Sequence, residues 1–215
     1  MNDTAALPPN AVIGIVGGGQ LGRMSAIAAA QLGYRTHILT QDASGPAAQV
    51  ADAITLGAYD DPAALEAFAR AVDVVTFEFE NISADALDHL SRHCPVRPSG
   101  HILRISQDRL AEKTFLSEAG IPLAPWRAVL NRADLHDAAT SLGLPLILKS
   151  TRNGYDGQGQ LRVHHASELS HAFATLAPHP PAAQASADFA RAPCALVARA
   201  HAAPGRGSEP VQATR

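Results

Sequence analysis

The chain has 215 residues, an apolar content of 47% and a formal net charge of -3. These values allow a sizeable buried core, and they exclude both the strongly basic surface of a nucleic-acid-binding protein and a long acidic tail. The apolar runs are too short for a membrane span, and residues 1–10 lack the basic start and apolar centre of a signal peptide, so we expect a cytoplasmic protein.

The first part of the chain, residues 11–100, alternates short apolar runs with amphipathic stretches, which is typical of a parallel sheet with crossover helices. Strands are predicted over 11–16, 35–40, 52–57 and 72–79. Helices are predicted over 20–33, 61–72 and 83–93. Pro62 at an early helix position and Ser83 at an N-cap position support the second and third helices. The sequence therefore predicts an α/β domain with a doubly wound parallel sheet.

Residues 101–120 show one long amphipathic pattern that ends at Gly120 and predicts a connecting helix. Residues 121–177 then predict a small α+β domain, in which a strand, a glycine-rich loop and a second strand form an antiparallel hairpin with a mobile tip. Residues 178–215 are rich in Ala, Pro, Arg and Gly without a sustained period. We expect a mostly disordered tail there, apart from a short strand over 194–199.

The turn after the first strand is rich in glycine, and Val12 to Met24 reads VIGIVGGGQLGRM. The spacing G-x-G-x-x-G is formed by Gly17, Gly19 and Gly22. With Asp42 at the position of a ribose-binding acid, the pattern allows a dinucleotide site. Gln20 and Arg23 are bulky polar residues around the turn, so a monophosphate at the helix N-terminus fits equally well. A plain tight turn is the third interpretation.

The segment FEFEN, from Phe77 to Asn81, lies at the carboxyl end of a strongly apolar strand. Ligands of open α/β sheets bind at this edge, where packing explains two carboxylates and an amide poorly. Glu78 and Glu80 point to opposite faces if the strand continues, so we expect only one of them to face a ligand. Such a carboxylate accepts hydrogen bonds from hydroxyl or amine groups of a small substrate. The alternative is that both carboxylates end the strand in solvent.

The segment LILKSTRNGYDGQGQ, residues 146–160, ends an apolar strand with Lys149 and continues into a glycine-rich loop. Gly154, Gly157 and Gly159 let this loop fold over a polyphosphate and offer it backbone N–H groups. The lysine precedes the glycines and no helix opens after them, so this is not a Walker motif. A strand lysine with a glycine-rich hairpin lid is another recurring phosphate site, and a plain flexible hairpin is the alternative.

On the connecting helix, Arg109 and Lys113 stand four residues apart and therefore on one face, where both could reach the same anion. For Lys113 we favour an ordinary surface charge. The ten histidines show no metal-ligand spacing. Cys94 and Cys194 are far apart and predict neither a disulfide framework nor a zinc site.

Together, four segments resemble the ATP-grasp family: GIVGGGQLGRM, FEFEN, QDRLAEKTFLSEAGIPLAPW and KSTRNGYDGQGQ. The resemblance covers residues 12–177 and is most specific to the branch that carboxylates 5-aminoimidazole ribonucleotide in purine biosynthesis. It implies a carbon–nitrogen ligase in which ATP phosphorylates bicarbonate to carboxyphosphate, which then carboxylates the exocyclic amine of the ribonucleotide. The glycine turn would serve a ribonucleotide, so the interpretation of Asp42 as a dinucleotide anchor is dropped.

The resemblance also implies roles for the domains and for individual residues. Residues 11–100 would bind the ribonucleotide, and residues 121–177 would form an incomplete ATP-grasp domain. The ATP-binding residues would be Arg109, Lys149, Gly154, Tyr155, Asp156, Gly157, Gln158, Gly159 and Gln160. The ribonucleotide-binding residues would be Gly19, Gln20, Leu21, Glu78 and Asn81. Catalysis would rest on Lys149, with Tyr155 and Asp156 orienting bicarbonate or the amine. ATP, Mg²⁺ and a homodimer are implied, without nucleic-acid or membrane partners.

The sequence departs from the family pattern towards its C-terminus. Family members run further and carry acidic strands that hold Mg²⁺, whereas Glu209 is the only glutamate after Glu168, and Asp188 the only aspartate. We therefore expect no metal ligands in this chain. The composition of residues 178–215 is typical of a shifted reading frame in a GC-rich gene, so we expect a truncated or frameshifted product. An inactive remnant and, with less support, a Rossmann-type NAD(P)-dependent oxidoreductase stay open as alternatives.

Overall fold

A computed structural model describes residues 6–152, 159–176 and 181–185, together with the backbone of short strands between residues 192 and 213. The chain divides into two compact units. One unit is formed by Pro9–Ala185, and the other by Met1–Pro8 with Ser186–Arg215. The site residues that the structure describes all lie in the unit Pro9–Ala185.

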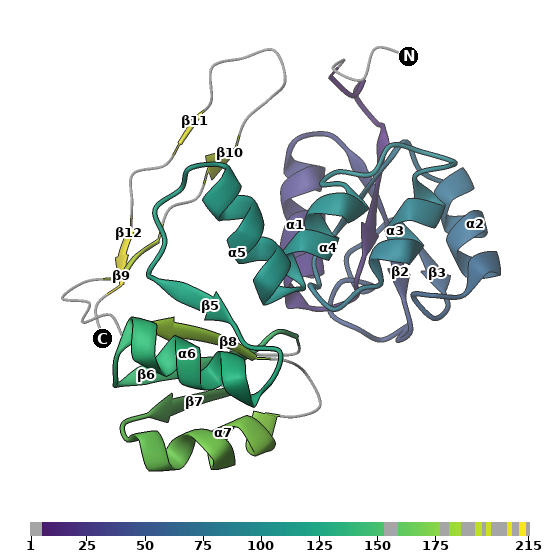
Figure 1. Ribbon diagram of the computed structural model, residues 1–215. Coiled ribbons are helices and arrows are strands. Elements are labelled where there is room, and N and C mark those ends of the chain that lie inside the picture. Colours follow the sequence, from purple (N-terminus) through teal and green to yellow (C-terminus); the bar gives the residue numbers. More distant parts are fainter. Residues whose placement is uncertain are drawn as a thin grey trace. The chain divides into compact units, whose positions relative to one another are not determined.

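The first sheet of this unit has four parallel strands in the order β3-β2-β1-β4. They are β1 (Val12–Val16), β2 (Arg35–Thr40), β3 (Ala53–Leu56) and β4 (Val74–Phe77). Figure 1 labels the neighbouring strands β2 and β3 of this sheet. The helices of this part are α1 (Gln20–Gln31), α2 (Pro62–Arg70) and α3 (Ala84–Leu90). Because β1 and β4 are parallel neighbours, the turn after β1 and the loop after β4 meet at the same edge. The doubly wound parallel sheet that the sequence predicted is confirmed.

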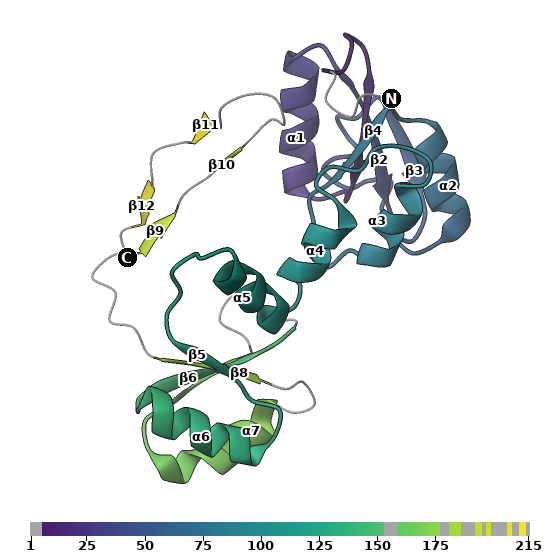
Figure 2. The ribbon, with the colours of Figure 1, turned by 45° about the horizontal axis from the view of Figure 1, so that its top comes forward.

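Successive residues of the central strands pack against helices on opposite faces of this sheet. Ile15 and Ile38 belong to a small core on the α1 side. Val16 and Leu39 pack instead with Phe68 in the larger core beneath α2 and α3. Figure 2 shows α1 on one side of the sheet and α2 and α3 on the other. Since helices cover both faces, the carboxyl edge of the strands is the open place for a ligand.

Two helices follow, α4 (Gly100–Ser106) and α5 (Arg109–Glu118), where the sequence predicted a single one. Asp108 between them has extended backbone, with φ -121° and ψ 113°. Its side chain accepts hydrogen bonds from the N–H groups of Leu110 and Ala111, so Asp108 is the N-cap of a new helix. The break leaves the apolar period unchanged, which is why the sequence pattern did not reveal it.

The second sheet has four antiparallel strands in the order β5-β8-β6-β7. They are β5 (Trp126–Ala128), β6 (Leu146–Ser150), β7 (Gln160–Val163) and β8 (Pro181–Ala185). One face is covered by α6 (Arg132–Leu142) and α7 (Leu169–Leu176), as Figure 2 shows, and α7 is preceded by the 3-10 turn Ala166–Glu168. Leu146 and Leu148 are buried in the core on that face, so Ile147 and Lys149 lie on the opposite one. The predicted hairpin is present as β6 and β7.

Strand β8 corrects the expectation of disorder for residues 181–185. It lies between β5 and β6 and pairs with both of them, and Ala182 and Ala183 are fully buried. A central strand of small residues that is buried on both faces lacks the alternation of apolar and polar side chains by which strands are recognised. The low contrast of this segment therefore reflects burial rather than disorder.

The other unit contains short strands whose backbone is described: β9 (Ala192–Cys194), β10 (Val197–Ala198), β11 (Arg206–Gly207) and β12 (Val211–Ala213). β9 pairs with β12 and β10 pairs with β11, both in antiparallel orientation. The β10–β11 pair lies between β9 and β12 in the sequence, which is the pairing order of one long hairpin. The registers of the two pairs differ by one residue. The short strand predicted over 194–199 overlaps β9 and β10.

Candidate nucleotide and substrate site

The glycine turn between β1 and α1 is folded around a carboxylate. Glu78, the first residue after β4, accepts a hydrogen bond from the N–H of Gly19 at 3.2 Å. Gly17 has φ +122°, and a Cβ atom there would lie 2.5 Å from Oε1 of Glu78. A Cβ atom at Gly22 would lie 2.8 Å from the carbonyl oxygen of Gly17. The turn needs these glycines because its backbone passes so close to Glu78 and to itself.

The position of Glu78 decides which part of a ligand this turn can hold. The N-terminus of α1 carries the partial positive charge that commonly binds phosphate. Here the carboxylate of Glu78 already accepts from the N–H of Gly19, so a phosphate at the same place would face a second anion. Hydroxyl and amine groups suit the turn better, since they donate hydrogen bonds to a carboxylate. The interpretation as a phosphate site at this helix end is therefore disfavoured.

The side chain of Asp42 forms hydrogen bonds within a local turn. Its carboxylate accepts hydrogen bonds from the N–H of Ser44 at 2.8 Å and from the hydroxyl of Ser44 at 2.6 Å. These two bonds lower the pKa of Asp42. A self-contained turn of this kind closes the loop after β2 and agrees with dropping Asp42 as a ribose anchor.

The loop after β4 is fastened to the junction of α4 and α5. Nε2 of Gln107 donates hydrogen bonds to the carbonyl oxygens of Glu80 and Ile82, both at 2.6 Å. Ile82 is buried, whereas Glu80 and Asn81 are exposed. The two glutamates of FEFEN thus lie in different surroundings, with Glu78 inside the glycine turn and Glu80 at the surface.

The first turn of α5 is joined to the end of β6. The N–H of Arg109 donates to the carbonyl oxygen of Thr151 at 2.9 Å, and its Nε donates to that of Ser150 at 3.3 Å. These bonds hold the guanidinium group of Arg109 beside the strand that carries Lys149. Burial and the charge of Arg109 together lower the pKa of Lys149. The structure therefore brings together the two cations that the sequence assigned to ATP phosphates.

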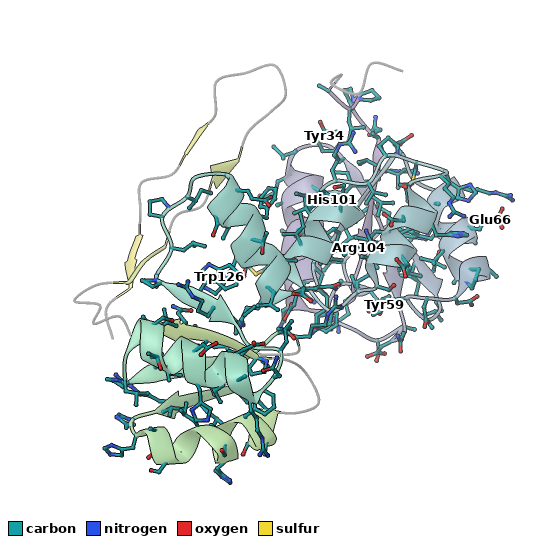
Figure 3. The ribbon with its side chains drawn as sticks, in the orientation of Figure 1. Tyr34, Tyr59, Glu66, His101, Arg104 and Trp126 are labelled. Atoms are coloured by element: carbon teal, nitrogen blue, oxygen red, sulfur yellow. The ribbon has the colours of Figure 1, made fainter. Side chains whose placement is uncertain are left out.

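A cavity of about 800 Å³ lies where the loop after β4, the α4–α5 junction and the end of β6 meet. Three arginines line it. Arg104, which is labelled in Figure 3, forms ion pairs with Asp85 at 2.8 Å and Asp88 at 2.7 Å. Arg152 forms one with Asp108 at 3.3 Å. Within the described part of the chain, the third arginine, Arg109, has no carboxylate partner. Its positive charge is thus available to an anion that enters the cavity.

Lys113 is a further cation of the site. It lies one turn after Arg109 on α5 and is 9% exposed. Burial, followed by the charges of Lys149 and Arg109, lowers the pKa of Lys113. Its Nζ lies over the ring of Trp126 on β5, 5.8 Å from the ring centre. The expectation that Lys113 is an ordinary surface charge was wrong, and its spacing from Arg109 was the sequence signal that pointed to the site.

Comparison with known proteins accounts for both parts of the chain. A family model described as the ribonucleotide synthetase preATP-grasp domain matches residues 10–107. A model of the ATP-grasp domain matches residues 114–214, so the two models together include most of the chain. The chain belongs to the ATP-grasp family. This membership overturns the alternative of a Rossmann-type oxidoreductase.

The ATP-grasp match runs well beyond residue 177, where the resemblance noted in the sequence ended. It includes β8 and the short strands between residues 192 and 213. A segment that is translated in a shifted frame is not expected to match a model of its own family. The match therefore speaks against a frameshift as the origin of this segment.

Several relatives of this ATP-grasp chain carry the same name. The N5-carboxyaminoimidazole ribonucleotide synthase of Brucella melitensis is 47% identical over 199 residues, which are 92% of this chain and 55% of the relative. A solved ADP complex of an N5-carboxyaminoimidazole ribonucleotide synthetase is 33% identical, with a TM-score of 0.90 over 97% of this chain and 55% of that one. The Aspergillus clavatus enzyme, solved with ADP and 5-aminoimidazole ribonucleotide, is 28% identical, with a TM-score of 0.84 over 96% of this chain and 54% of that one. The chain thus spans about half the length of these relatives.

The residues that the sequence assigned to the ribonucleotide surround one edge of the parallel sheet. Gly19 is the N-cap of α1, and Gln20 and Leu21 are the exposed first residues of this helix. Glu78 accepts the hydrogen bond from Gly19, and Asn81 lines the cavity. These residues come from two chain segments that only the pairing of β1 with β4 brings together.

The residues that the sequence assigned to ATP are described in part. Gly159, with φ +69°, precedes β7, and Gln160 pairs with Lys149 in the register of the hairpin. Gly154, Tyr155, Asp156, Gly157 and Gln158 lie outside the described residues. The described residues of this set are therefore Arg109, Lys149, Gly159 and Gln160.

The described residues include no group of three or more histidine, cysteine, aspartate or glutamate side chains placed to hold a metal ion. The described part of the chain therefore offers no ligand set for Mg²⁺. The cationic side chains at the end of β6 suit the phosphates of a nucleotide instead. Among the described helices, none combines the length and apolar character needed to cross a bilayer.

Proposed function

We propose that this chain takes part in the ATP-dependent carboxylation of 5-aminoimidazole ribonucleotide by bicarbonate, a carbon–nitrogen ligase reaction of purine synthesis that proceeds through carboxyphosphate. The observation that carries the proposal is that Arg109 and Lys149 lie together at the end of β6, where the charge of Glu112 acts on Lys149. Within the described part of the chain, neither cation forms an ion pair with a carboxylate. Such a pair suits a polyphosphate. The named relatives support the choice of reaction.

In this proposal Arg109 and Lys149 bind the phosphates of ATP and stabilise the negative charge that moves during phosphoryl transfer. Backbone hydrogen bonds to Ser150 and Thr151 keep Arg109 in place for this task. By family resemblance, residues Gly154 to Gln160 are assigned to covering the nucleotide. Exclusion of water by this cover protects carboxyphosphate from hydrolysis before it meets the amine. Tyr155 and Asp156 are assigned to orienting bicarbonate or the amine.

The ribonucleotide is assigned to the edge of the parallel sheet. Glu78 would accept hydrogen bonds from its hydroxyl or amine groups, because a carboxylate at the glycine turn disfavours the substrate phosphate there. Gly19, Gln20 and Leu21 would contact the same molecule through the first turn of α1. Asn81 would contact it from the loop that Gln107 fastens.

Mg²⁺, a cytoplasmic location and a homodimer complete the proposal by family resemblance. One feature of α1 supports the homodimer: Met24 and Ile27, one turn apart, are 65% and 42% exposed. Large apolar side chains that repeat along one helix face form a stripe that a second copy would cover. A monomer in sedimentation at micromolar concentration would contradict this part of the proposal.

The test of the reaction is ADP release by the purified chain with ATP, Mg²⁺, bicarbonate and 5-aminoimidazole ribonucleotide. We expect turnover that requires the ribonucleotide and falls by about 100-fold or more in the variant Lys149→Ala, because one phosphate-stabilising cation is removed. Turnover that ignores the ribonucleotide, or that is unchanged in the variant, would contradict the proposal. Absence of turnover from a chain that circular dichroism shows to be folded would favour an inactive remnant.

A further inference from the structure

Lysine is used at two positions only in this chain, Lys113 and Lys149, although lysine and arginine together number 17. The other 15 of these 17 basic residues are arginines. Both lysines are withdrawn from solvent: Lys113 is 9% exposed and Lys149 is half-buried. A lysine is a compact charge with three donors that adapts to a phosphate oxygen. Because both lysines of the chain are withdrawn from solvent, we take their role to be the binding of a ligand rather than solubility.

Lys113 lacks the partner that a buried ammonium group usually has. Lysines are rarely buried unless they are paired, because an unpaired charge away from water is costly. Within the described part of the chain, ion pairs are made by Arg70, Arg104 and Arg152, and none by Lys113. The ammonium group lies over the ring of Trp126 instead, in a cation–π contact.

Strand register places Trp126 on the same sheet face as Lys149. Trp126 of β5 is paired with Gln184 of β8, and Gln184 is paired with Ile147 of β6. Residues that are directly paired across strands share a face, and so do residues two apart along one strand. Trp126, Ile147 and Lys149 therefore lie on one face, opposite the core beneath α6 and α7. Lys113 reaches this face from α5 through its contact with Trp126.

Three positive charges thus converge around the end of β6. Lys149 and Arg109 both act electrostatically on Lys113, and the neighbouring Glu112 is the acidic side chain that opposes them. Like charges that are gathered in a partly buried place raise the free energy of the chain unless an anion neutralises them. A polyphosphate supplies several negative charges in a row and would relieve this repulsion.

We propose that Lys113 is a third phosphate-binding residue, which rests on Trp126 in the free chain and binds a nucleotide polyphosphate together with Lys149 and Arg109. The inference rests on the proposed function and adds a residue to the nucleotide site. It gives the site a reason to prefer a triphosphate to a single phosphate, since each further phosphate group meets another cation.

The presence of two lysines makes a footprinting experiment direct. An amine-acylating reagent modifies Lys113, Lys149 and the N-terminal amine, and peptide mass spectrometry separates the three products. With the full chain and inorganic tripolyphosphate as the probe, we expect acylation of both lysines to slow by about fivefold or more, because bound phosphate holds the amines protonated. The N-terminus serves as the internal control. Protection of Lys149 alone would overturn the inference.

A charge-removing variant gives an independent test. Lys113→Met keeps the length of the side chain and removes its charge, so we expect calorimetric affinity for tripolyphosphate to fall about tenfold. Arg132→Gln removes one positive charge from an exposed position of α6 and should change the affinity by less than about twofold. Equal affinities of Lys113→Met and the parent chain would overturn the inference. If this variant does not fold, the footprint decides.

The two proposals fail in different ways. Tripolyphosphate binding that depends on Lys113, without ADP release from ATP, would uphold the role of Lys113 and overturn the ligase reaction. ADP release from ATP with Lys113 unprotected would uphold the reaction and overturn the role. Absence of any tripolyphosphate binding by the parent chain would overturn the role of Lys113.

Discussion

A carboxylate inside a glycine turn changes what the turn can bind. The spacing of Gly17, Gly19 and Gly22 is shared with dinucleotide sites, in which the N–H groups face a pyrophosphate. Here a Cβ atom at Gly17 would collide with Glu78, and the N–H of Gly19 donates to it. The glycines therefore make room for a side chain of the protein itself.

This arrangement gives a prediction for Glu78→Gln, which removes the charge and keeps an oxygen that can accept from Gly19. We expect the affinity for 5-aminoimidazole ribonucleotide to fall by about 10- to 100-fold, because hydrogen bonds to a charged acceptor are stronger than those to a neutral one. ATP binding should not change. Calorimetric titration measures both ligands, with Asp42→Asn as a control at an exposed turn. A variant that binds the ribonucleotide as the parent does would contradict the assignment of Glu78.

His37 makes the stability of the chain depend on pH. Its Nε2 lies 2.8 Å from the hydroxyl of Thr55, its ring packs edge-on against Phe68, and burial lowers its pKa. The unfolded chain then binds the proton more readily, so the free energy of unfolding falls as pH drops below the ordinary histidine pKa of about 6.5. We expect the urea midpoint to fall less in His37→Gln than in the parent between roughly pH 7.5 and 5.5. Identical slopes would contradict this role.

At the scale of elements, the junction of α4 and α5 holds both halves of the site. Consecutive residues have different tasks there: Gln107 binds the loop after β4, Asp108 caps α5, and Arg109 binds the end of β6. A change in one connection should therefore affect one ligand more than the other.

We expect Gln107→Ala to lower the free energy of unfolding by about 1–2 kcal/mol, because the carbonyl groups of Glu80 and Ile82 lose their donor. The same variant should weaken binding of the ribonucleotide more than binding of tripolyphosphate. Urea unfolding and calorimetry measure the two effects. Gln31→Ala, at an exposed position of α1, is the control and should cost less than about 0.5 kcal/mol. An equal loss of affinity for both ligands would argue against a specific effect of Gln107 on the ribonucleotide site.

Strand β8 is the element whose presence is simplest to test. It pairs on both sides, with β5 and with β6, so its N–H groups are engaged in the sheet. We expect amide hydrogen exchange of residues 182–185 to be slowed by about 100-fold or more relative to an unstructured peptide. Exchange at the rate of a free peptide would restore the expectation of disorder for this segment.

At the scale of the whole molecule, ligand binding should stabilise the fold by mass action. At an ATP concentration of about 100 times the dissociation constant, the free energy of unfolding should rise by about 2.7 kcal/mol. Urea unfolding with and without ATP measures this increase, and Lys149→Ala should reduce it strongly at the same ATP concentration. A full increase in the variant would show that ATP binds elsewhere on the chain.

The sequence alone predicted the parallel sheet, the glycine turn and the β6–β7 hairpin, whereas the joint assignment of Arg109 and Lys149 to ATP came from the family resemblance. These features follow from local periodicity and from motifs whose residues are close in the chain. The N-cap at Asp108 was missed although it is local, because it interrupts a helix without changing the apolar period. Predictions on Tyr155 and Asp156 stay predictions, as these residues lie outside the described part.

Tertiary structure decided where Glu78, β8 and Lys113 belong. Glu78 and Gly19 are 59 residues apart in the sequence, and only the pairing of β1 with β4 brings the two together. β8 is a strand because β5 and β6 bind it on either side, not because its alanines favour extended backbone. Lys113 is withdrawn from solvent, and its ammonium group lies over the ring of Trp126 from another element. In each case the deciding free energy comes from contacts between distant residues, which a local pattern does not contain.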